Sequence, residues 1–297
     1  MSSTPRSVLQ DEHRALYVAS RSKWAPQCIG PYCQAVSVQQ CTFGAGQIGL
    51  DPFSMQLVAG GLHAQMRQAV LSAARVLHVA SPIRDEASAL FTAWLPEAEY
   101  LHMAQATRTC AQHIEAQLRD ILHRAEEEEG DSCTDGSDSD SRSSHAPGSD
   151  ELALDFAHTE SLPDWPVLAL ACQALPRAAL FECVCHAARF THVRATDTSY
   201  HLGSVQLPDM RQQWSFTAVA GVAGQPLAAA AQGLQQGPGP ACSVQVYGRC
   251  AEEASSLQAA ADVAGAAYAF IPVQHWSFGR CCSDQAILLM VVARQLA

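Results

Sequence analysis

The chain has 297 residues and is 48% hydrophobic, which is enough for one or two globular domains with sizeable cores. No run of about 18 apolar residues occurs and the N-terminus lacks the apolar segment of a secretory signal, so we expect a cytoplasmic protein without a membrane span. The formal net charge is −11, but nine acids and one base lie between Glu126 and Asp150. The remainder is close to neutral, which disfavours a nucleic-acid partner because phosphate binding requires clustered Lys and Arg.

The 12 cysteines and 12 histidines show no metal-binding pattern. No CxxC pair occurs, and no histidine pair follows at zinc-finger spacing. His102, His113 and His123 lie ten or eleven residues apart along one predicted helix, which is too far for a helical metal site. We therefore predict no metal, and we expect reduced, buried thiols.

Strands and helices alternate in the predicted element order. A helix over residues 62–80 is indicated by apolar residues at three- and four-residue spacing. The other expected elements are strands over 14–20, 41–48, 87–95, 167–172 and 180–185 and a helix over 97–124. The sequence GLDP at 49–52 predicts a turn, and so does ALPRA between the last two strands. This order predicts an α+β fold, or an α/β layer, with helices on one face of the sheet.

Three further regions complete the domain prediction. Residues 1–13 are expected to be a disordered N-terminus. Residues 126 to about 160 are rich in Ser, Asp, Glu and Gly and cannot bury enough apolar surface to order, so we predict a disordered acidic insertion. A docking segment or phosphorylation site is the alternative there. Residues 189–297 are predicted to contain strands at 215–222, 242–247, 268–273 and 286–294 and a helix at 252–264. Their order echoes the first domain, which suggests a degenerate second copy.

Separated motifs within residues 14–188 resemble the Rid family of reactive-intermediate (enamine/imine) deaminases. They are APQCIGPYCQAV at 25–36, GAGQIGLDP at 44–52, LVAGGLHAQMRQAVLSAARVL at 57–77 and ALPRAALFE at 174–182. The resemblance implies a Rid-type, chorismate-mutase-like mixed sheet packed on two helices. It also implies assembly as trimers with ligand clefts between subunits.

The resemblance implies which residues line the cleft. In active members a tyrosine of the GPY motif lines it, an arginine binds the substrate carboxylate and a glutamate positions the water. Tyr32 matches the tyrosine, and Ala45 replaces a frequent serine before Gly46. Counting along the motif, the arginine position falls at Val167 and the glutamate position at Val184. Valine cannot make charge-assisted contacts, so deaminase chemistry is expected to be mostly lost. Glu182, two residues before Val184 on the same strand face, is the remaining candidate base.

The residues of two motifs resemble one group of Rid-type proteins in particular. SKWAPQCIGPYCQAV and AGQIGLDPFSMQLVAGG are similar to the Rid-type region that follows the ATP-binding domain in eukaryotic diphthine–ammonia ligases, as is FIPVQHW at 270–276. Those enzymes amidate diphthine on elongation factor 2 at the expense of ATP. Neither an SGGKDS-like PP-loop nor GxxxxGK[ST] occurs in this chain, so we expect no cofactor in it. ATP would be a cofactor only if an upstream PP-loop domain exists.

These observations leave three functional hypotheses. The first is a non-catalytic binding or oligomerisation module of a diphthine–ammonia ligase-like protein, as a homotrimer or as an intramolecular Rid–Rid pair, with elongation factor 2 as a partner. The second is an enamine/imine deaminase that uses Tyr32 and Glu182. The third is a small-molecule sensor whose apolar cleft accepts an uncharged ligand.

Overall fold

The computed structural model describes the chain in segments that cover both predicted regions. The described residues are 13–38, 41–80, 88–106, 109–130, 167–188, 190–195, 199–204, 213–221, 241–249, 255–263, 265–278, 281–282 and 288–296. Of the predicted disordered regions, residues 1–12 and 131–160 lie outside them, whereas His13, predicted to end the disordered N-terminus, begins a strand. Within the described part, no helix is long and apolar enough to cross a membrane.

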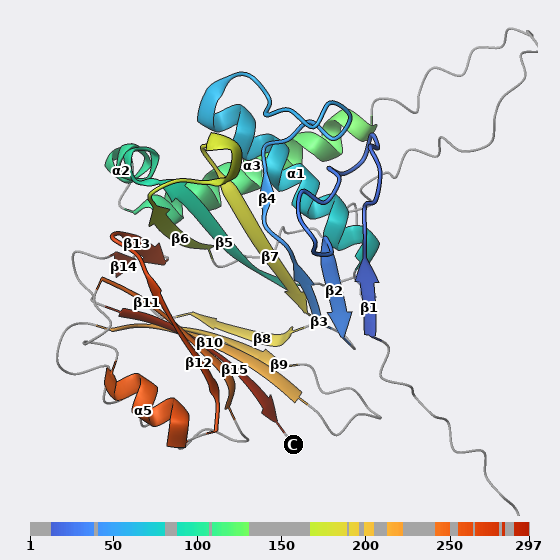
Figure 1. Cartoon of the computed structure of the whole chain (residues 1–297). Helices are drawn as coiled ribbons and strands as arrows, with labels where there is room; N and C mark the ends of the chain where they lie inside the picture. The colour runs from blue at the N-terminus through green and yellow to red at the C-terminus, as the bar shows by residue number, and fades with distance from the viewer. Residues whose placement is uncertain are drawn as a thin grey trace, which may run out of the picture.

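A mixed sheet is built mainly from the N-terminal half of the chain (Figure 1). Its described strands are β1 (His13–Leu16), β2 (Ala35–Val38), β3 (Cys41–Gly44), β4 (Gln47–Ile48), β5 (Ser88–Pro96), β6 (Val167–Cys172), β7 (Glu182–Ala188), β13 (Trp276–Phe278) and β14 (Cys281–Cys282). The strand order is β1-β2-β3-β7-β5-β6-β13-β14, with β4 paired to β7. Only β5 and β6 run parallel among the described pairs of this sheet.

Helices cover one face of this sheet. They are α1 (Gly61–Ala80), α2 (Glu97–Ala106) and α3 (Cys110–Gly130). The apolar stripe of α1 packs with α3 on alternate residues of the central strands, and together they form the main core. This core contains alternate residues of the central strands, Phe91 and Ala93 of β5 and Cys183 and Cys185 of β7. Such alternation is expected because successive side chains of a strand point to opposite faces of the sheet. The predicted α+β class, a mixed sheet packed on helices, is confirmed.

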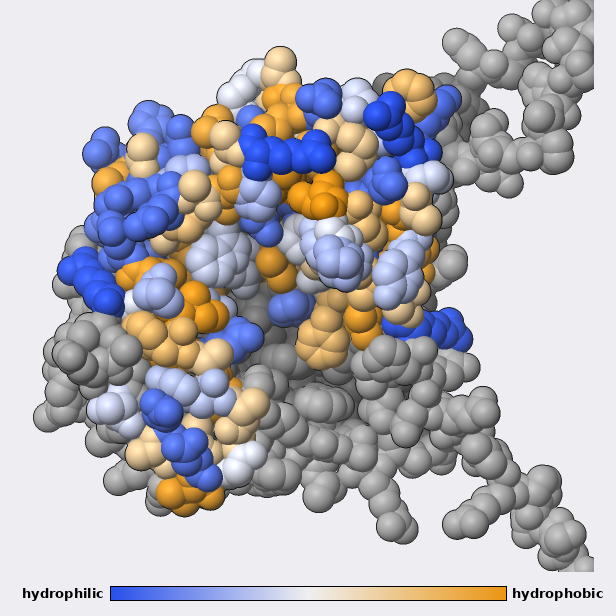
Figure 2. Space-filling view, in the orientation of Figure 1, coloured by the Kyte–Doolittle hydropathy of each residue, from blue (hydrophilic) through white to orange (hydrophobic). Residues whose placement is uncertain are grey.

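A second sheet lies against the helix-free face of the first (Figure 1). Its described strands are β8 (Phe190–Ala195), β9 (Ser199–Ser204), β10 (Gln213–Gly221), β11 (Ala241–Gly248), β12 (Ala267–Pro272) and β15 (Leu288–Leu296). The helix α5 (Ser255–Val263) connects β11 to β12 and packs against β12. The face of the molecule in Figure 2 carries apolar and polar residues side by side.

The second sheet repeats the topology of the first. Its order is β8-β9-β10-β15-β11-β12, which matches β1-β2-β3-β7-β5-β6 strand for strand. In each sheet one described pair is parallel, β11 with β12 and β5 with β6, and the other pairs along this order are antiparallel. The same alternation of strands and helix in the sequence therefore produces the same sheet twice.

The chain passes from the second sheet back to the first near its C-terminal end. β12 ends in the second sheet, and β13 pairs antiparallel with β6 in the first. Between them, the N–H of Val273 donates to the carbonyl oxygen of Gly248 at 2.9 Å. The carbonyl of His275 accepts from the N–H of Ala171, also at 2.9 Å. The C-terminal region is thus hydrogen-bonded into both sheets.

Several predicted boundaries need correction. The predicted helix over 97–124 is two helices, α2 and α3, and α3 continues to Gly130. The run Glu126–Glu129, predicted to begin the disordered insertion, is therefore helical, as the good helix propensity of glutamate allows. The strands β2, β8, β9, β13 and β14 were not predicted, because they are short or lack a clear alternation of apolar residues.

Candidate functional site

The predicted turn around Gly30 and Pro31 presents Tyr32 at the surface. The N–H of Tyr32 donates to the carbonyl of Gly30 at 2.9 Å, and a Cβ at Gly30 would lie 2.6 Å from the Tyr32 ring. Glycine is therefore required for the ring to fold back over the turn. The Tyr32 side chain is 42% exposed. It is a surface phenol held in one place by a tight turn.

Two buried glutamines that the sequence did not single out hold this loop on the sheet. The side-chain amide of Gln34 donates to the carbonyl of Pro26 at 2.6 Å. The side-chain amide of Gln47 in β4 donates to the side-chain oxygen of Gln34 at 2.7 Å, and the N–H of Ala45 donates to the backbone carbonyl of Gln34 at 2.8 Å. Buried amides need such partners, so the two glutamines fix the position of Tyr32 relative to Gly46.

Glu182, at the start of β7, is the carboxylate whose charge acts on Tyr32. A Cβ added at Gly46 would collide with the Glu182 carboxylate, so Gly46 leaves the space that this side chain occupies. The pKa of Tyr32 is raised by burial and next by the charges of Glu182 and Cys28. The structure therefore brings together Tyr32, Gly46 and Glu182, three residues that the sequence had marked.

Burial raises the pKa of the Glu182 carboxyl. Within the described part of the chain, no Lys or Arg forms an ion pair with it. The thiol of Cys172, at the end of β6, also has a raised pKa, because of burial first and the Glu182 charge second. A carboxyl in such a setting can accept a proton from a nearby water, which is the property expected of a general base.

The two valines of the predicted cleft lie on different faces of the sheet. Val184 is half-buried and shares the helix-free face with Glu182. Val167 is 0% exposed and belongs to the core beneath the helices. The expectation that Val167 lines the same cleft as Tyr32 is therefore not met. Counting residues along a motif gave its position in β6 but not the face to which it points.

The helix-free face around Glu182 is covered by the second sheet. Trp94 of β5 lies opposite Glu182 in the strand pairing, and its ring contacts that of Tyr247 from β11, with the ring centroids 6.3 Å apart. Burial raises the pKa of Tyr247 to about 12, and its hydroxyl donates to the side chain of Gln245 at 2.9 Å. A pocket of about 790 Å³ lies between the two halves of the chain, and Cys172 is among its lining residues.

Other candidates from the sequence are placed apart from this group. Asp51 forms the predicted turn, because the N–H of Ser54 donates to its carboxylate at 2.6 Å. Arg177 lies in the short 3₁₀ turn η2 (Pro176–Ala178) and donates to the carbonyl of Met55 at 2.7 Å. The pKa of His113 is lowered by burial and then by His102 and His63, so these histidines are closer than their spacing indicates. Among the residues described, however, no group of three or more His, Cys, Asp or Glu could hold a metal ion.

The segment that contains the Tyr32 loop and α1 is similar to known proteins. The sequence profile of the family described as Endoribonuclease L-PSP matches residues 22–82. The chain is 46% identical over 56 residues to the 2-iminobutanoate/2-iminopropanoate deaminase of Mus musculus, which covers 19% of this chain and 42% of the relative. It is 41% identical over 73 residues to the diphthine–ammonia ligase of Schizosaccharomyces pombe, which covers 25% of this chain and 12% of the relative.

Solved structures of similar proteins give weaker likenesses. The RidA protein of the Antarctic bacterium Psychrobacter aligns with 56% of this chain and 95% of its own at 19% identity, with a TM-score of 0.34. The E. coli YjgF gene product aligns with 59% of this chain and 98% of its own at 16% identity, also with a TM-score of 0.34.

The sequence matches are similarities over one segment and cover only part of each protein. Residues 22–82 carry the Rid-type, endoribonuclease L-PSP-like sequence that the motifs indicated. Both imine deaminases and a diphthine–ammonia ligase are among the relatives. The matched segments span about two fifths of the deaminases' length and about an eighth of the ligase's.

Proposed function

We propose that this chain is the Rid-type region of a diphthine–ammonia ligase-like protein and serves there as a binding and assembly module. The observation that carries the proposal is the packing of the chain's own second sheet on the helix-free face of the first. A face that is covered within one chain has no need of a second subunit to bury it. The match to the ligase, which is longer than that to the mouse deaminase, supports the same assignment.

The proposal predicts an intramolecular pair in place of a homotrimer. Light scattering should give the mass of one chain, 31.8 kDa, at micromolar concentrations. A mass three times larger would contradict the intramolecular pair and show that the chain forms a homotrimer. Exposed edge strands are the usual route to such association, so the measurement is best made over a range of concentrations.

The proposal assigns ATP binding to another part of the ligase. Calorimetric titration of this chain with Mg-ATP should give no binding heat, and tight binding would overturn the assignment. Elongation factor 2 is the partner that the proposal implies. Titration of purified elongation factor 2 with this chain, alone and joined to a PP-loop domain, tests whether the Rid-type region contributes to its recognition. Equal affinity of the PP-loop domain with and without this chain would exclude that contribution.

A second candidate function is imine hydrolysis, which the meeting of Tyr32, Gly46 and Glu182 favours. In that reaction water adds to C2 of an imine while the Glu182 carboxylate takes a proton from it. The nitrogen takes up that proton from Glu182 and then the proton of the new C2 hydroxyl, so the C2–N bond breaks and ammonia leaves as the C2 carbonyl forms. A raised carboxyl pKa suits proton transfer near neutral pH.

The deaminase candidate is tested with 2-iminobutanoate, generated in place from threonine by a dehydratase. Activity that depends on the site should fall about a hundredfold or more in Glu182→Gln, in line with the usual contribution of a general base. Tyr32→Phe should reduce it as well. Tyr17→Phe is the matched control, because Tyr17 is a 64% exposed tyrosine outside the group. No turnover by the unaltered chain would eliminate this candidate and leave the binding module.

A further inference from the structure

We propose that the pocket between the two halves of the chain binds a small molecule that bears a carboxylate, and that Arg249 is its anchor. The pocket has a volume of about 790 Å³, within the range of small-molecule sites. It is lined by the end of β6, the first residue of α2, Arg249 after β11 and residues 272–275. The site does not rest on imine hydrolysis, and neither Tyr32 nor Glu182 is among its lining residues.

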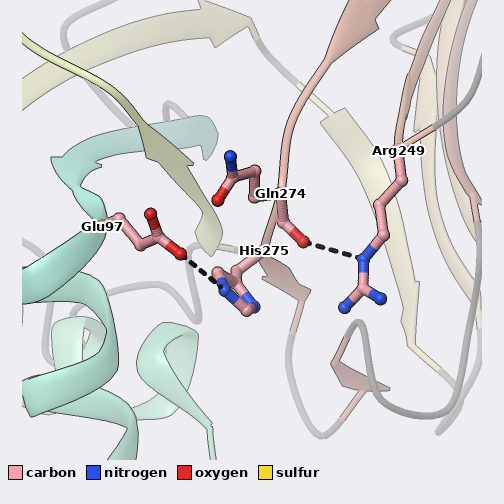
Figure 3. A network of polar contacts seen from close by, with 4 residues as sticks. All are labelled: Glu97, Arg249, Gln274 and His275. Carbon is pink, nitrogen blue, oxygen red and sulfur yellow. Dashed lines mark hydrogen bonds and ion pairs between the residues drawn. The ribbon is translucent and has the colours of Figure 1, made fainter.

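Arg249 has its terminal nitrogens available for a ligand. Its Nε–H donates to the carbonyl oxygen of Gln274 at 3.0 Å, which orients the guanidinium plane (Figure 3). No ion pair among the described residues engages Arg249, although the side chain of Glu97 lines the same pocket. A guanidinium has five N–H donors, so the four on the terminal nitrogens can face a planar carboxylate with two parallel hydrogen bonds.

The negative charge of the pocket is already engaged by other groups. Nε2 of His275 lies 3.2 Å from a carboxylate oxygen of Glu97 (Figure 3). With its amide nitrogen turned towards Glu97, Gln274 donates to the two carboxylate oxygens at 2.9 and 3.0 Å. The ring of Tyr100 stacks on His275 with centroids 5.8 Å apart and fixes the imidazole. Glu97 is therefore held on the opposite wall, and Arg249 is the charge presented to a ligand.

The rest of the lining indicates the size and polarity of the ligand. Ala171, Ala174, Pro272 and Val273, all small or apolar residues, are part of the lining. The Cys172 thiol donates to the carbonyl of Leu95 at 3.3 Å, and its pKa is raised, so it stays neutral. One arginine opposite a short apolar wall fits a single carboxylate on a small carbon chain, such as a 2-oxo acid. Polyphosphates require several cations and would be poorly matched.

The test is calorimetric titration of the full chain with 2-oxobutanoate, with butan-2-one as an uncharged probe of similar size. We expect 2-oxobutanoate to bind and butan-2-one not to bind. The affinity for 2-oxobutanoate should fall about tenfold or more in Arg249→Gln. Arg249→Lys should keep part of the affinity, because a single ammonium charge replaces the two parallel donors of the guanidinium. Arg21→Gln is the matched control, since Arg21 is an exposed arginine in the N-terminal loop. The melting temperature of each variant verifies that the fold is kept.

Two further variants separate this site from the Tyr32 group. Tyr32→Phe and Glu182→Gln should leave the affinity for 2-oxobutanoate unchanged. Because 2-oxobutanoate is also the product of the candidate imine hydrolysis, binding that is lost in Tyr32→Phe or Glu182→Gln but kept in Arg249→Gln would assign the probe to the Tyr32 group and overturn the proposal. Glu97→Gln should keep or strengthen binding, because it removes the one acidic side chain of the lining. The proposal is overturned if the folded chain shows no binding of 2-oxobutanoate at about 10 mM, since a dissociation constant weaker than this would be too weak for a specific site. It is equally overturned if Arg249→Gln binds as well as the unaltered chain.

Discussion

The hydroxyl oxygen of Ser277 accepts a hydrogen bond from the backbone N–H of Ala111 at 2.9 Å, across a separation of 166 residues. Ala111 lies in the first turn of α3, where backbone N–H groups have no partner within the helix. The hydroxyl of Thr109 accepts from the N–H of Gln112 at 3.2 Å and caps the same turn locally. The C-terminal strand β13 thus completes the cap of an N-terminal helix.

Replacing Ser277 by alanine should destabilise the fold by about 1–3 kcal/mol, because it leaves the buried N–H of Ala111 without an acceptor. Urea unfolding followed by circular dichroism measures the change in the free energy of unfolding. Ser20→Ala is the matched control, since Ser20 is an exposed serine in the loop after β1. Equal unfolding free energies for the two variants would show that Ser277 adds nothing to the cap.

Trp276, next to Ser277, is 1% exposed and faces the opposite side of the sheet. It lies opposite Leu170 of β6, on the helix-free face of the first sheet. Trp276→Ala should cost about 3–5 kcal/mol, as expected for removal of a large buried aromatic side chain. Calorimetry should show a lower melting temperature for a single transition, because the segment that leads into β13 is hydrogen-bonded to both sheets. A transition that splits, with one part unchanged, would show that the halves unfold independently.

The sequence predicted the elements whose signal is local. The apolar stripe of α1, the turn at Asp51 and the turn that presents Tyr32 each depend on residues a few positions apart, and each is found where expected. The meeting of Gly46 and Glu182 could be anticipated only through the family resemblance. Local patterns do not give the pairing of β4 with β7 that brings these two residues together.

Features that depend on distant pairing could not be predicted. β13 has three residues, too few for an alternation pattern, and its partner β6 lies about a hundred residues away. The contact of Glu97 with His275 arises from the same pairing, which is why neither residue was singled out. Val167 was assigned to the cleft for a related reason. The face on which a strand residue points depends on register, and the register was set by neighbours that the motif does not include.

Gly46→Ala should displace the Glu182 carboxylate more than it disturbs the backbone, because the collision is with the end of a flexible side chain. We expect a loss of about 1 kcal/mol in stability. The pKa of Tyr32 should also fall towards its ordinary value, since the Glu182 charge contributes to raising it. Ultraviolet titration, taken as the difference from Tyr32→Phe, measures this shift. In the double variant Gly46→Ala/Glu182→Ala the stability cost of Gly46→Ala should largely disappear, whereas additive costs would argue against the collision.

Glu182→Gln should stabilise the fold at neutral pH, although the residue belongs to the candidate site. Because burial raises the pKa of the Glu182 carboxyl, the folded state binds this proton more tightly than the unfolded chain does. Above the folded-state pKa the ionised carboxylate therefore lowers stability, and the penalty is relieved as the pH falls through that pKa towards the unfolded value of about 4.3. The advantage of Glu182→Gln should shrink over the same window in urea unfolding experiments.

Asp51 provides a comparison of opposite sign for the same experiment. Hydrogen bonds from Ser54 lower the pKa of the Asp51 carboxyl, so its ionised form stabilises the folded state above the unfolded pKa. That contribution is lost as the pH falls through the lowered pKa. Asp51→Asn should therefore reduce stability at pH 7 and lose its effect in acid, whereas Glu182→Gln increases stability at pH 7. If both variants shifted stability in the same direction, the buried setting of Glu182 could not be the cause, and its fitness as a proton acceptor would have to be sought elsewhere.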